Sequence, residues 1–508
     1  MTKFSRAAGL GPVLASAVLG AVAALGQAPF DWPIFTLIGF ALAFHIILQA
    51  DQTRQAGLRA WGLGVGYFGL TLSWLVEPFL VDAARHGWMA PFALFFMAAG
   101  LALLWGCAAG VAHRFARPSQ RWLALALALT ASEMLRGRLF TGFPWGSPGH
   151  VWIETPFAQL ATYIGASGLG ALTFFLSALI VHIASQPRGS RKQVAHFALF
   201  AVIVGVALLV SIHRGNQPLP ADRDVILRLV QPNAPQHLKW DRRYAFDFVR
   251  RQIEFTAADP APGQPRPDLV IWPETAVPTL LEWAEEVRDA IADAAQGTPV
   301  LFGVQRGDGM QYYNSLALID AVGQVEATYD KHHLVPFGEY IPLGNWLERF
   351  GISAFASQAG NGYSAGQGPQ VMDMGVAGLA LPLICYEAVF PRDIRGAETR
   401  ADWLLHATND AWFGEYSMPY QHLAQARFRA IEFGLPVIRV ANTGISAVID
   451  ARGDLRESIL LGEAGYLDAP LPGADYPTPY SRHGDLPLAV LIAVALCMLM
   501  IRRVAKAR

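Results

Sequence analysis

The sequence predicts an α-helical polytopic membrane bundle of eight spans joined to a layered α/β sandwich domain. The chain has 508 residues, of which 53% are hydrophobic and only 16% are charged, whereas a soluble protein carries about 25% charged residues. The deficit lies in residues 1–213, where long apolar runs hold almost no charge. Residues 222–475 have the composition of a soluble domain, in which short runs rich in Val, Ile and Leu alternate with segments of helical spacing, as in α/β folds.

Each membrane span needs roughly 17–25 mainly apolar residues. Seven candidates form a transmembrane bundle within residues 1–213, and one forms a C-terminal transmembrane helix at 486–501. The first also has features of a signal peptide, since Lys3 and Arg6 precede an Ala-rich core. We interpret it as an uncleaved span, because its apolar run is long and further spans follow. The candidates lie at 8–26, 33–50, 60–80, 89–112, 122–135, 157–185, 194–213 and 486–501.

Basic residues flank these spans unevenly, and the flanks rich in Lys and Arg are expected to face the cytoplasm. With eight spans, both termini are then cytoplasmic and residues 214–485 face outward. In a bacterium this places residues 222–475 on the periplasmic side of the inner membrane. The sparser, outward flanks hold Arg85, Arg136, Arg138, Arg214 and Arg482. The richer flanks hold Lys3, Arg6, Arg54, Arg59, Arg114, Arg117, Arg121, Arg188, Arg191, Lys192, Arg502, Arg503, Lys506 and Arg508.

Two polar features of the membrane part do not by themselves indicate function. Glu77 and Glu133 lie near predicted span ends, so a solvated position at the interface is the simpler interpretation of both acids. The loop at 136–152 contains the run Phe143-Pro-Trp-Gly146 and a second proline. This loop is either a re-entrant segment near lipid or an aromatic anchor at the membrane interface.

The soluble part follows a linker at 214–222 and is predicted to be a sandwich of layers. Continuous apolar strands are buried on both faces, and hairpins are expected around Gly323 and Gly453. Strands are predicted at 225–230, 268–272, 299–304, 315–320, 324–329, 376–384, 403–406, 437–440, 445–450 and 455–459, and helices at 240–256, 281–295 and 418–433.

Charge and cysteine content exclude several classes of function. The formal net charge is -1, so no overall field favours nucleic acid. Of the three cysteines, Cys107 and Cys497 lie in apolar runs and Cys385 stands alone in the soluble part. An odd count without paired spacing argues against a disulfide framework, and no CxxC pair or His/Cys cluster indicates zinc. We therefore expect no metal.

Three predicted strands end in a reactive side chain, the usual place for an active site in α/β folds. The first is the run from Asp268 to Glu274, in which Pro273 ends the strand and Glu274 projects from the turn. A carboxylate beside an apolar strand and Trp272 would have a raised pKa, as a general base near neutral pH needs. The alternative is a solvated loop acid, since most Glu side chains are exposed.

The second strand end carries Lys331. A lysine directly after a strand can stabilise a developing oxyanion and lower the pKa of a nearby thiol. His332 and His333 follow it. Neighbouring residues on a strand point to opposite faces, so these two cannot easily share a metal ion, and we expect structural roles for both.

The third strand end carries Cys385. A thiol after a buried strand and before an expected helix start at Ala388 lies where the helix dipole favours the thiolate. The following amide, that of Tyr386, can serve in an oxyanion hole. The alternative is a buried structural cysteine. Together, the carboxylate, the cation and the thiol form a complete set for covalent catalysis.

The order Glu–Lys–Cys and the strings around it resemble the nitrilase (carbon–nitrogen hydrolase) superfamily. The predicted spans narrow the resemblance to the bacterial apolipoprotein N-acyltransferases, and the resemblance covers essentially the whole chain. The strings that carry it are 231–240, 272–274, 331–339, 385–387 and 409–414. The resemblance implies a four-layer α-β-β-α sandwich for residues 222–475.

The resemblance also implies roles for individual residues. Glu274 would be the base, Lys331 the oxyanion stabiliser and Cys385 the nucleophile. The supporting residues of the site would be Glu339, Tyr386 and Glu387, with Trp240 and Trp412 on mobile loops near its entrance.

The implied activity is the final step of bacterial lipoprotein maturation. A phospholipid, usually phosphatidylethanolamine, would donate an acyl group to Cys385 as a thioester. The N-terminal amine of an S-diacylglyceryl cysteine on an apolipoprotein would then accept it, in a ping-pong reaction without a cofactor. The expected partners are these two substrates and the membrane lipids, and we expect a monomer.

Other classes of function fit less well. A membrane-anchored amidase would use the same three residues but would need only one anchor. A transporter with an appended domain is disfavoured, because the spans show no obvious inverted repeat and no charge at mid-span. A structural scaffold would leave the Glu–Lys–Cys set unexplained.

Overall fold

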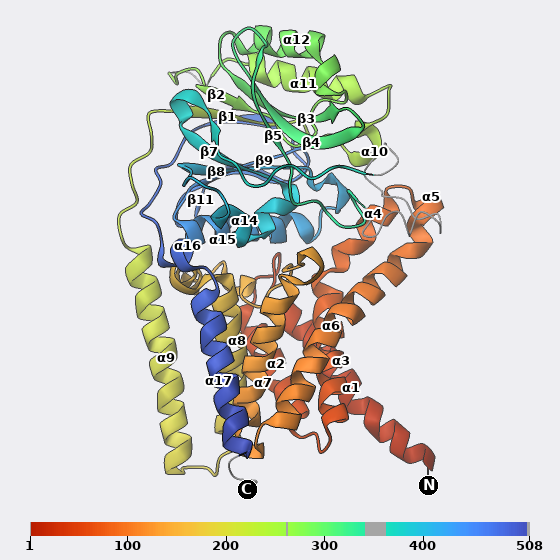
Figure 1. Ribbon diagram of the computed structural model, residues 1–508, viewed down its shortest axis with the longest axis vertical. Helices are drawn as coiled ribbons and strands as arrows, with labels where there is room; N and C mark the ends of the chain where they lie inside the picture. The colour runs from red at the N-terminus through yellow and green to blue at the C-terminus, as the bar shows by residue number, and fades with distance from the viewer. Residues whose placement is uncertain (1, 261–262, 341–361, 505–508) are drawn as a thin grey trace. The chain divides into compact units, whose positions relative to one another are not determined.

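The computed structural model describes residues 2–260, 263–340 and 362–504 (Figure 1). The chain divides into two compact units. The helical unit comprises Met1–Gln217, Tyr416–Ala424 and Thr478–Arg508. The α/β unit comprises Pro218–Glu415 and Gln425–Pro477.

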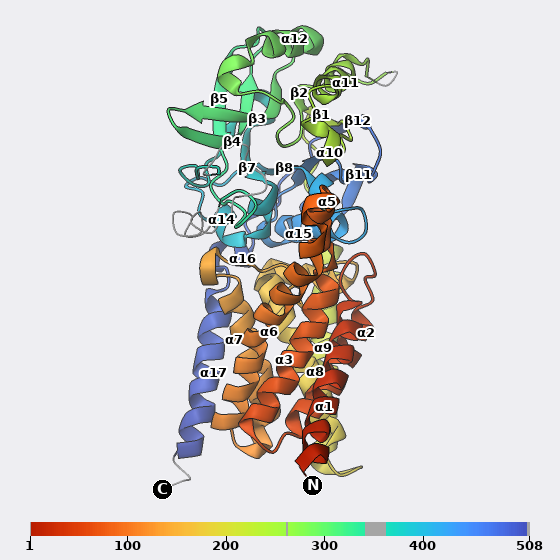
Figure 2. The ribbon, with the colours of Figure 1, turned by 90° about the vertical axis from the view of Figure 1, so that its right-hand side faces the viewer.

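Long apolar helices make up most of the helical unit, and Figure 2 shows them lying alongside one another. Each predicted span overlaps one of these helices in sequence. Among the described residues they are α1 (Thr2–Ala24), α2 (Pro33–Leu48), α3 (Thr53–Thr71), α6 (Ala90–Phe115), α7 (Arg121–Arg136), α8 (Ala161–Ala184), α9 (Arg191–Gly215) and α17 (Leu486–Val504).

The predicted count of eight spans is not confirmed. Three described helical segments are long and apolar enough to cross a membrane: Ala83–Phe115, Pro156–Ala184 and Arg191–Gly215. A fourth is possible if Thr53–Thr71 and Ser73–Leu80, which meet at 67°, form one broken span. The shorter apolar stretches of helix are Gly9–Ala24, Pro33–Leu48 and Leu486–Leu499. Helix α2, for example, has 16 residues, which is about 24 Å of helix against a hydrocarbon core of about 30 Å.

Aromatic rings and close helix contacts form the core of the helical unit. A buried cluster joins α2, α3, α6 and α8, and small residues let α1 approach α3. A Cβ added to Gly66 would lie 1.8 Å from the carbonyl oxygen of Ala17. Such small-residue contacts are typical of helices packed in a membrane. The clustered rings are Phe40, Phe44, Tyr67, Phe68, Trp105 and Phe174.

Glu133 is not the solvated interfacial acid that the sequence predicts. Its carboxylate forms a two-pronged ion pair with the buried Arg136, at 2.5 Å and 3.0 Å, and accepts a hydrogen bond from Trp105 Nε1 at 2.8 Å. The Arg136 guanidinium also donates to the carbonyl oxygens of Phe143 and Trp145. The pair therefore organises the loop at 136–152.

The loop at 136–152 has both buried and exposed aromatic side chains. Trp145 is buried in the helical unit, where its Nε1 donates to Gln421 Oε1 at 2.7 Å. Gln421 also accepts from Trp74 and donates to the carbonyl oxygens of Ala28 and Thr71. By contrast, Phe140 is 88% exposed with a φ of 53°.

The α/β unit contains two six-stranded sheets with orders β12-β1-β2-β3-β4-β5 and β11-β10-β9-β8-β7-β6. Strands β1, β2 and β3 are parallel in the first sheet, and β7, β8 and β9 are parallel in the second. The strands are β1 (Ile226–Gln231), β2 (Leu269–Ile271), β3 (Val300–Asp308), β4 (Gln311–Ile319), β5 (Val325–Asp330), β6 (Met372–Asp373), β7 (Leu379–Ile384), β8 (Trp403–Thr408), β9 (Val437–Ala441), β10 (Ser446–Ile449), β11 (Leu455–Ile459) and β12 (Gly465–Pro470).

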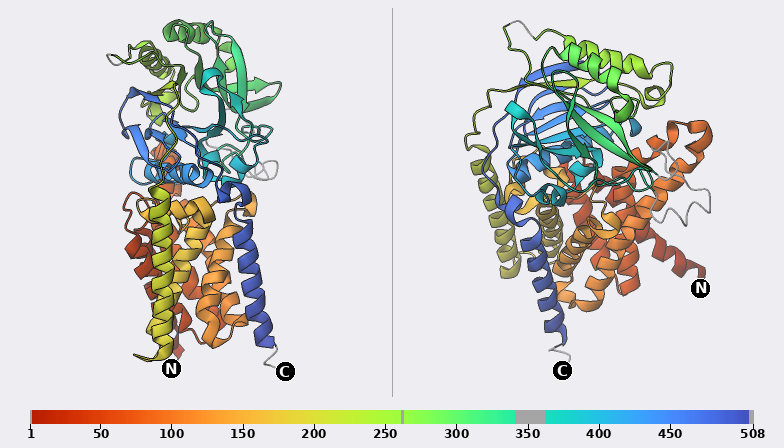
Figure 3. Two further views of the ribbon diagram at one scale, coloured as in Figure 1. Left: turned by 90° about the vertical axis from the view of Figure 1, so that its left-hand side faces the viewer. Right: turned by 45° about the horizontal axis from the view of Figure 1, so that its top comes forward.

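One apolar cluster lies between the two sheets and includes Leu227, Ile271, Ile384 and Leu405. A second lies under α11 (Ala245–Ala257) and α12 (Glu285–Ala295), which cover the outer face of the first sheet (Figures 1 and 3). On the second sheet lie α14 (Pro391–Arg395) and α15 (Met418–Phe433). The layered α/β sandwich that the sequence predicts is therefore present, with two sheets and helices on their outer faces.

Some predicted elements differ from the observed ones. The strand predicted at 376–384 begins only at Leu379, because Val376 lies in an exposed turn of 3-10 helix. The helix predicted at 240–256 begins at Ala245, after the short α10 (Gln236–Lys239). Strand β12 was not predicted, since its outward positions are polar or half-exposed and its apolar run is short.

Candidate active site

Glu274 lies in the turn after β2 and is 7% exposed. Pro273 ends the strand, and the turn folds closely over Gly303 of the neighbouring β3. A Cβ at Gly303 would lie 2.3 Å from the carbonyl oxygen of Pro273 and 2.7 Å from the Cα of Glu274, so only glycine leaves room for this turn. The carboxylate is therefore held inside the unit and not in a solvated loop.

Lys331 follows β5 and is only 1% exposed. Its Nζ lies 2.8 Å from Glu339 Oε1 and 3.7 Å from Glu274 Oε1. Glu339 also accepts a hydrogen bond from the amide of Val335 at 2.8 Å. The cation is thus placed between two carboxylates.

Asn314 is a member of this group that the sequence analysis missed. It lies on β4 opposite the end of β5, and its carbonyl oxygen accepts from the Lys331 amide at 2.8 Å. Its Nδ2 donates to Glu274 Oε1 at 2.7 Å and to Glu339 Oε1 at 3.2 Å. The available signal was a polar residue at the start of the buried run 314–319 of β4.

Cys385 directly follows β7 of the other sheet, is 9% exposed and has a φ of 50°. This left-handed conformation is costly for a residue with a Cβ, and such strain is concentrated at functional sites. The turn continues as a short 3-10 helix, Cys385–Val389, so the helix begins at the cysteine and not at Ala388 as predicted. The hydroxyl of Thr408, at the end of β8, hydrogen bonds with the thiol.

The structure brings Glu274, Lys331 and Cys385 together, close enough for each to influence the ionisation of the others. Burial raises the pKa of Glu274, although Lys331 opposes the shift. Burial also raises the pKa of Cys385, with Glu274 adding to the shift and Lys331 opposing it. Burial disfavours the charge of Lys331, but Glu339 and Glu274 outweigh it and raise the pKa of this lysine. The pKa of Glu274 is shifted in the predicted direction, whereas the pKa of the Cys385 thiol is raised and not lowered as the sequence analysis expected.

Glu387 is buried two residues after the cysteine and binds the two active-site segments together. Its carboxylate accepts hydrogen bonds from the amides of Ile384 at 2.7 Å and His332 at 2.8 Å. Burial opposes its charge, but the imidazole of His332 and the Ile384 amide outweigh it and lower the pKa of Glu387. Tyr386, between the cysteine and Glu387, is buried with its ring edge-on to Phe390.

Two family models match this chain. One, for the apolipoprotein N-acyltransferase N-terminal domain, matches residues 19–179, and the carbon–nitrogen hydrolase model matches residues 228–470. The apolipoprotein N-acyltransferase of Caulobacter vibrioides is 39% identical, over 97% of this chain and 95% of its own length. The apolipoprotein N-acyltransferase of Rhodopseudomonas palustris is 37% identical, over 95% of this chain and 94% of its own length. This chain belongs to the apolipoprotein N-acyltransferase family.

Solved structures match about half of this chain. An amidase from Nesterenkonia sp. AN1 matches with a TM-score of 0.35 and 19% identity, over 51% of this chain and 94% of that one. A carbon–nitrogen hydrolase from Helicobacter pylori matches with a TM-score of 0.37 and 17% identity, over 48% of this chain and 88% of that one.

The strand geometry from which structural roles were expected for His332 and His333 is wrong. Both follow β5 instead of lying on it, and both reach the same carboxylate. Asp393 Oδ2 lies 2.7 Å from His333 Nδ1 and 3.7 Å from His332 Nε2. His333 also stacks on Phe390, with 3.8 Å between ring centroids.

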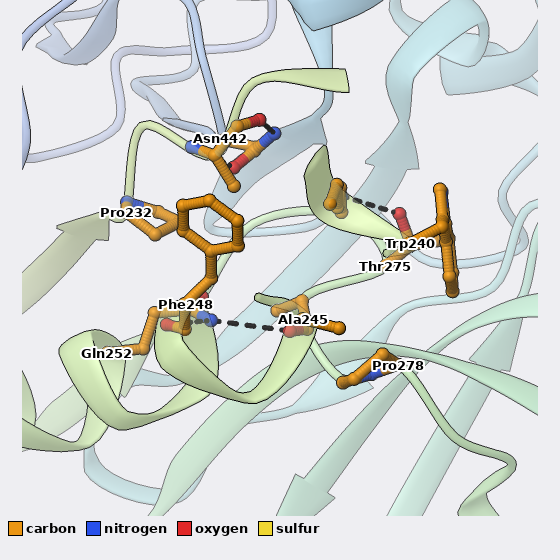
Figure 4. Close-up of a pocket in the computed structure, with 11 residues that line it drawn as sticks. Pro232, Trp240, Ala245, Phe248, Gln252, Thr275, Pro278 and Asn442 are labelled. Atoms are coloured by element: carbon orange, nitrogen blue, oxygen red, sulfur yellow. Dashed lines mark hydrogen bonds between the residues drawn. The ribbon is translucent and has the colours of Figure 1, made fainter. Parts of the chain in front are cut away.

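The two predicted aromatic residues lie on loops that hydrogen bonds connect. Trp240 follows α10 and lines a small pocket with Thr275, Phe248 and Gln252 (Figure 4). Trp412 ends the short helix Asp410–Trp412 after β8. The two loops meet where Asn409 Nδ2 donates to Gln236 Oε1 at 2.9 Å.

A buried polar network lies behind the nucleophile and was not predicted. Thr408 donates to Asp410 at 3.0 Å, and Asp410 pairs with Arg439 at 2.5 Å. Arg439 in turn lies 2.8 Å from His406 Nδ1, while His406 Nε2 lies 3.2 Å from the carbonyl oxygen of Cys385. The network therefore contacts both the side chain and the backbone of the cysteine.

Proposed function

We propose that this chain transfers a fatty acyl group from a phospholipid to the N-terminal amine of an S-diacylglyceryl cysteine on apolipoproteins. Membership of the apolipoprotein N-acyltransferase family supports N-acylation of a lipoprotein. The observation that carries the mechanism is the buried group of Glu274, Lys331 and Cys385, with a base, a cation and a strained nucleophile at adjoining strand ends.

The first half-reaction forms a thioester. Glu274 takes the proton of the Cys385 thiol as the sulfur attacks the ester carbonyl carbon of the phospholipid. The Lys331 ammonium and the Tyr386 amide stabilise the oxyanion of the tetrahedral intermediate. When the intermediate collapses, the C–O bond breaks, and Glu274 returns the proton to the departing lysophospholipid.

The second half-reaction forms the amide. The acceptor enters as a free α-amine, whose nitrogen attacks the thioester carbonyl while Glu274 removes a proton. The C–S bond breaks, and the proton passes from Glu274 to the sulfur, which restores the thiol. A thioester is reactive enough to acylate an amine, so no nucleotide or metal takes part. Glu339, Tyr386 and Glu387 hold the catalytic groups, and Trp240 and Trp412 cover the intermediate against water.

The proposed substrates explain why the chain needs a membrane part, because both substrates carry acyl chains that remain in lipid. Each buried CH₂ contributes about 0.8 kcal/mol of membrane affinity, so neither substrate leaves the bilayer readily. We propose eight spans in the bacterial inner membrane, seven within residues 1–213 and the last at 486–501. Residues 222–475 are then the periplasmic catalytic domain of a monomer, with both termini in the cytoplasm.

The test is intact-mass analysis of the detergent-purified chain after incubation with phosphatidylethanolamine, with Cys385→Ala alongside. An acyl adduct on the wild type that hydroxylamine removes, and that the variant lacks, supports the thioester. Addition of a diacylglyceryl lipopeptide should then discharge the adduct and yield an N-acylated peptide. A folded wild-type chain whose thiol reacts with iodoacetamide but never gains the adduct would overturn the phospholipid donor and favour a membrane-bound amidase.

A further inference from the structure

A second buried lysine contacts the turn that carries the base. Lys239 is the last residue of α10 and is 6% exposed. Its Nζ donates to the carbonyl oxygen of Glu274 at 3.1 Å and to Thr275 Oγ1 at 2.9 Å. Lysine is almost never buried to this degree unless it is paired, so its presence here needs a physical reason.

The contacted turn is one that needs support. Thr275 has a φ of 46°, a left-handed conformation that is costly for a β-branched residue. On its other side the same turn folds over Gly303, without room for a Cβ. The Lys239 ammonium thus binds the backbone oxygen of one turn residue and the side chain of the next, and fixes the direction in which the Glu274 carboxylate points.

Hydrogen bonding alone does not explain a charged residue at this position. Both direct acceptors of Lys239 are neutral, and a neutral donor would satisfy them at a lower desolvation cost. Among the described residues, Glu274 is the group whose charge acts on Lys239, and Lys331 and Glu339 act in turn on Glu274. The positive charge of Lys239 therefore acts mainly on the ionisation of Glu274.

We infer that Lys239 is a positioning residue for the general base, which fixes the Glu274 turn and supplies a second positive charge that favours the carboxylate. This inference rests on the proposed role of Glu274. Lys239 immediately precedes Trp240, and both line the pocket of Figure 4 together with Thr275. A movement of the Trp240 loop on substrate binding would therefore displace Lys239 and, through its hydrogen bonds, the turn that carries Glu274.

The ionisation of Lys239 itself should be visible in the pH dependence of the reaction. Burial lowers the pKa of Lys239 to about 8, although Glu274 opposes the shift. Above that pH the amine is neutral and its support for the carboxylate is lost. In a plot of the rate of acyl-enzyme formation against pH, the rate should therefore fall at high pH as Lys239 loses its proton (the alkaline limb). It should also fall at low pH as Glu274 gains a proton (the acidic limb).

The experiment measures the rate of acyl-enzyme formation against pH, by quenched intact-mass analysis with phosphatidylethanolamine. Lys239→Gln keeps a donor without the charge, Lys239→Met removes both, and Thr275→Val keeps the charge but removes one acceptor. Loss of hydrogen bonds from a charged group predicts a fall of roughly 10- to 100-fold for Lys239→Met. Exposed Arg242, on the same loop, provides the control Arg242→Met.

The pH profiles distinguish positioning from a merely structural role. Without the Lys239 charge the pKa of Glu274 rises, so both Lys239 variants should move the acidic limb to higher pH and lose the alkaline limb. Thr275→Val should slow the reaction without moving either limb, and Arg242→Met should match the wild type. Lys239 variants that acylate slowly with both limbs unmoved would overturn the inference, whereas a wild type without any adduct would overturn the proposed function instead.

Discussion

Replacement of Asn314 by leucine tests whether the two carboxylates of the site depend on one amide. Carboxylates only accept hydrogen bonds, so the amide nitrogen must face them, as it does at 2.7 Å to Glu274 and 3.2 Å to Glu339. Each hydrogen bond to a charged group contributes about 1.5–3 kcal/mol. Asn314→Leu removes both and leaves two buried carboxylates that share only Lys331.

The expected result is a slower reaction with a shifted pH dependence. If about 3 kcal/mol of the lost interaction falls on the reacting carboxylate, acyl-enzyme formation slows about 100-fold. The Asn314 amide lowers the pKa of Glu274, so its removal raises that pKa and moves the acidic limb of the rate to higher pH. The assay is quenched intact-mass analysis of the acyl adduct over a series of pH values.

A matched control is available on the same strand. Gln311 begins β4 but is exposed, so Gln311→Leu removes a similar amide without touching the site and should acylate at the wild-type rate. The reasoning would be refuted by a folded Asn314→Leu variant that keeps the wild-type rate and the wild-type acidic limb.

Three further predictions concern the support of the site. Gly303→Ala should displace the turn of the base and slow acyl-enzyme formation at least about 10-fold, as the same mass assay would detect; an unchanged rate would contradict the close contact. Arg439→Met leaves Asp410 buried without its ion pair and should lower the free energy of unfolding by about 3–5 kcal/mol, measured by denaturant titration in detergent; a loss under about 1 kcal/mol would be inconsistent with the pair. The pKa of His332 is raised and that of Glu387 lowered, so their pair stabilises fully between the ordinary values of 4.5 and 6.5 and weakens as the pH rises through the folded-state pKa of His332. The difference in melting temperature between the wild type and His332→Ala should therefore be larger at about pH 6 than at about pH 9, and a constant difference would exclude this pair as its source.

The positions of Glu274, Lys331 and Cys385 directly after buried strands were predictable because each carries a local signal. Glu274, Lys331 and Cys385 each follow a run of residues that forms a buried strand, and that run is visible without any knowledge of how the strands pair. The same is true of α15, for which the predicted bounds 418–433 match the observed Met418–Phe433. A prediction of this kind depends only on the residues nearest in sequence.

Asn314 and Lys239 were missed because their contacts depend on the pairing of strands and loops. Asn314 meets Glu274 across 40 positions of the sequence, and Lys239 meets the same turn across 35. Only the register of β4 on β5, which sets Ser315 opposite Asp330, places Asn314 beside Lys331. The prediction for Glu133 failed for a related reason, since the arginine that neutralises it was assigned to a solvated flank.

The buried charges explain how a thiol with a raised pKa can react. Lys239 and Lys331 supply two positive charges, and Glu274 and Glu339 supply two negative ones, so the group is neutral while the cysteine keeps its proton. Transfer of that proton to Glu274 moves the negative charge from the carboxylate to the sulfur and then to the substrate oxyanion, without changing the total. A buried site of low dielectric opposes the creation of net charge far more than its displacement over a few ångströms. The raised pKa of Cys385 is therefore compatible with catalysis as long as Glu274 accepts the proton in the same step, and removal of either lysine charge should hinder that transfer more than the binding of lipid.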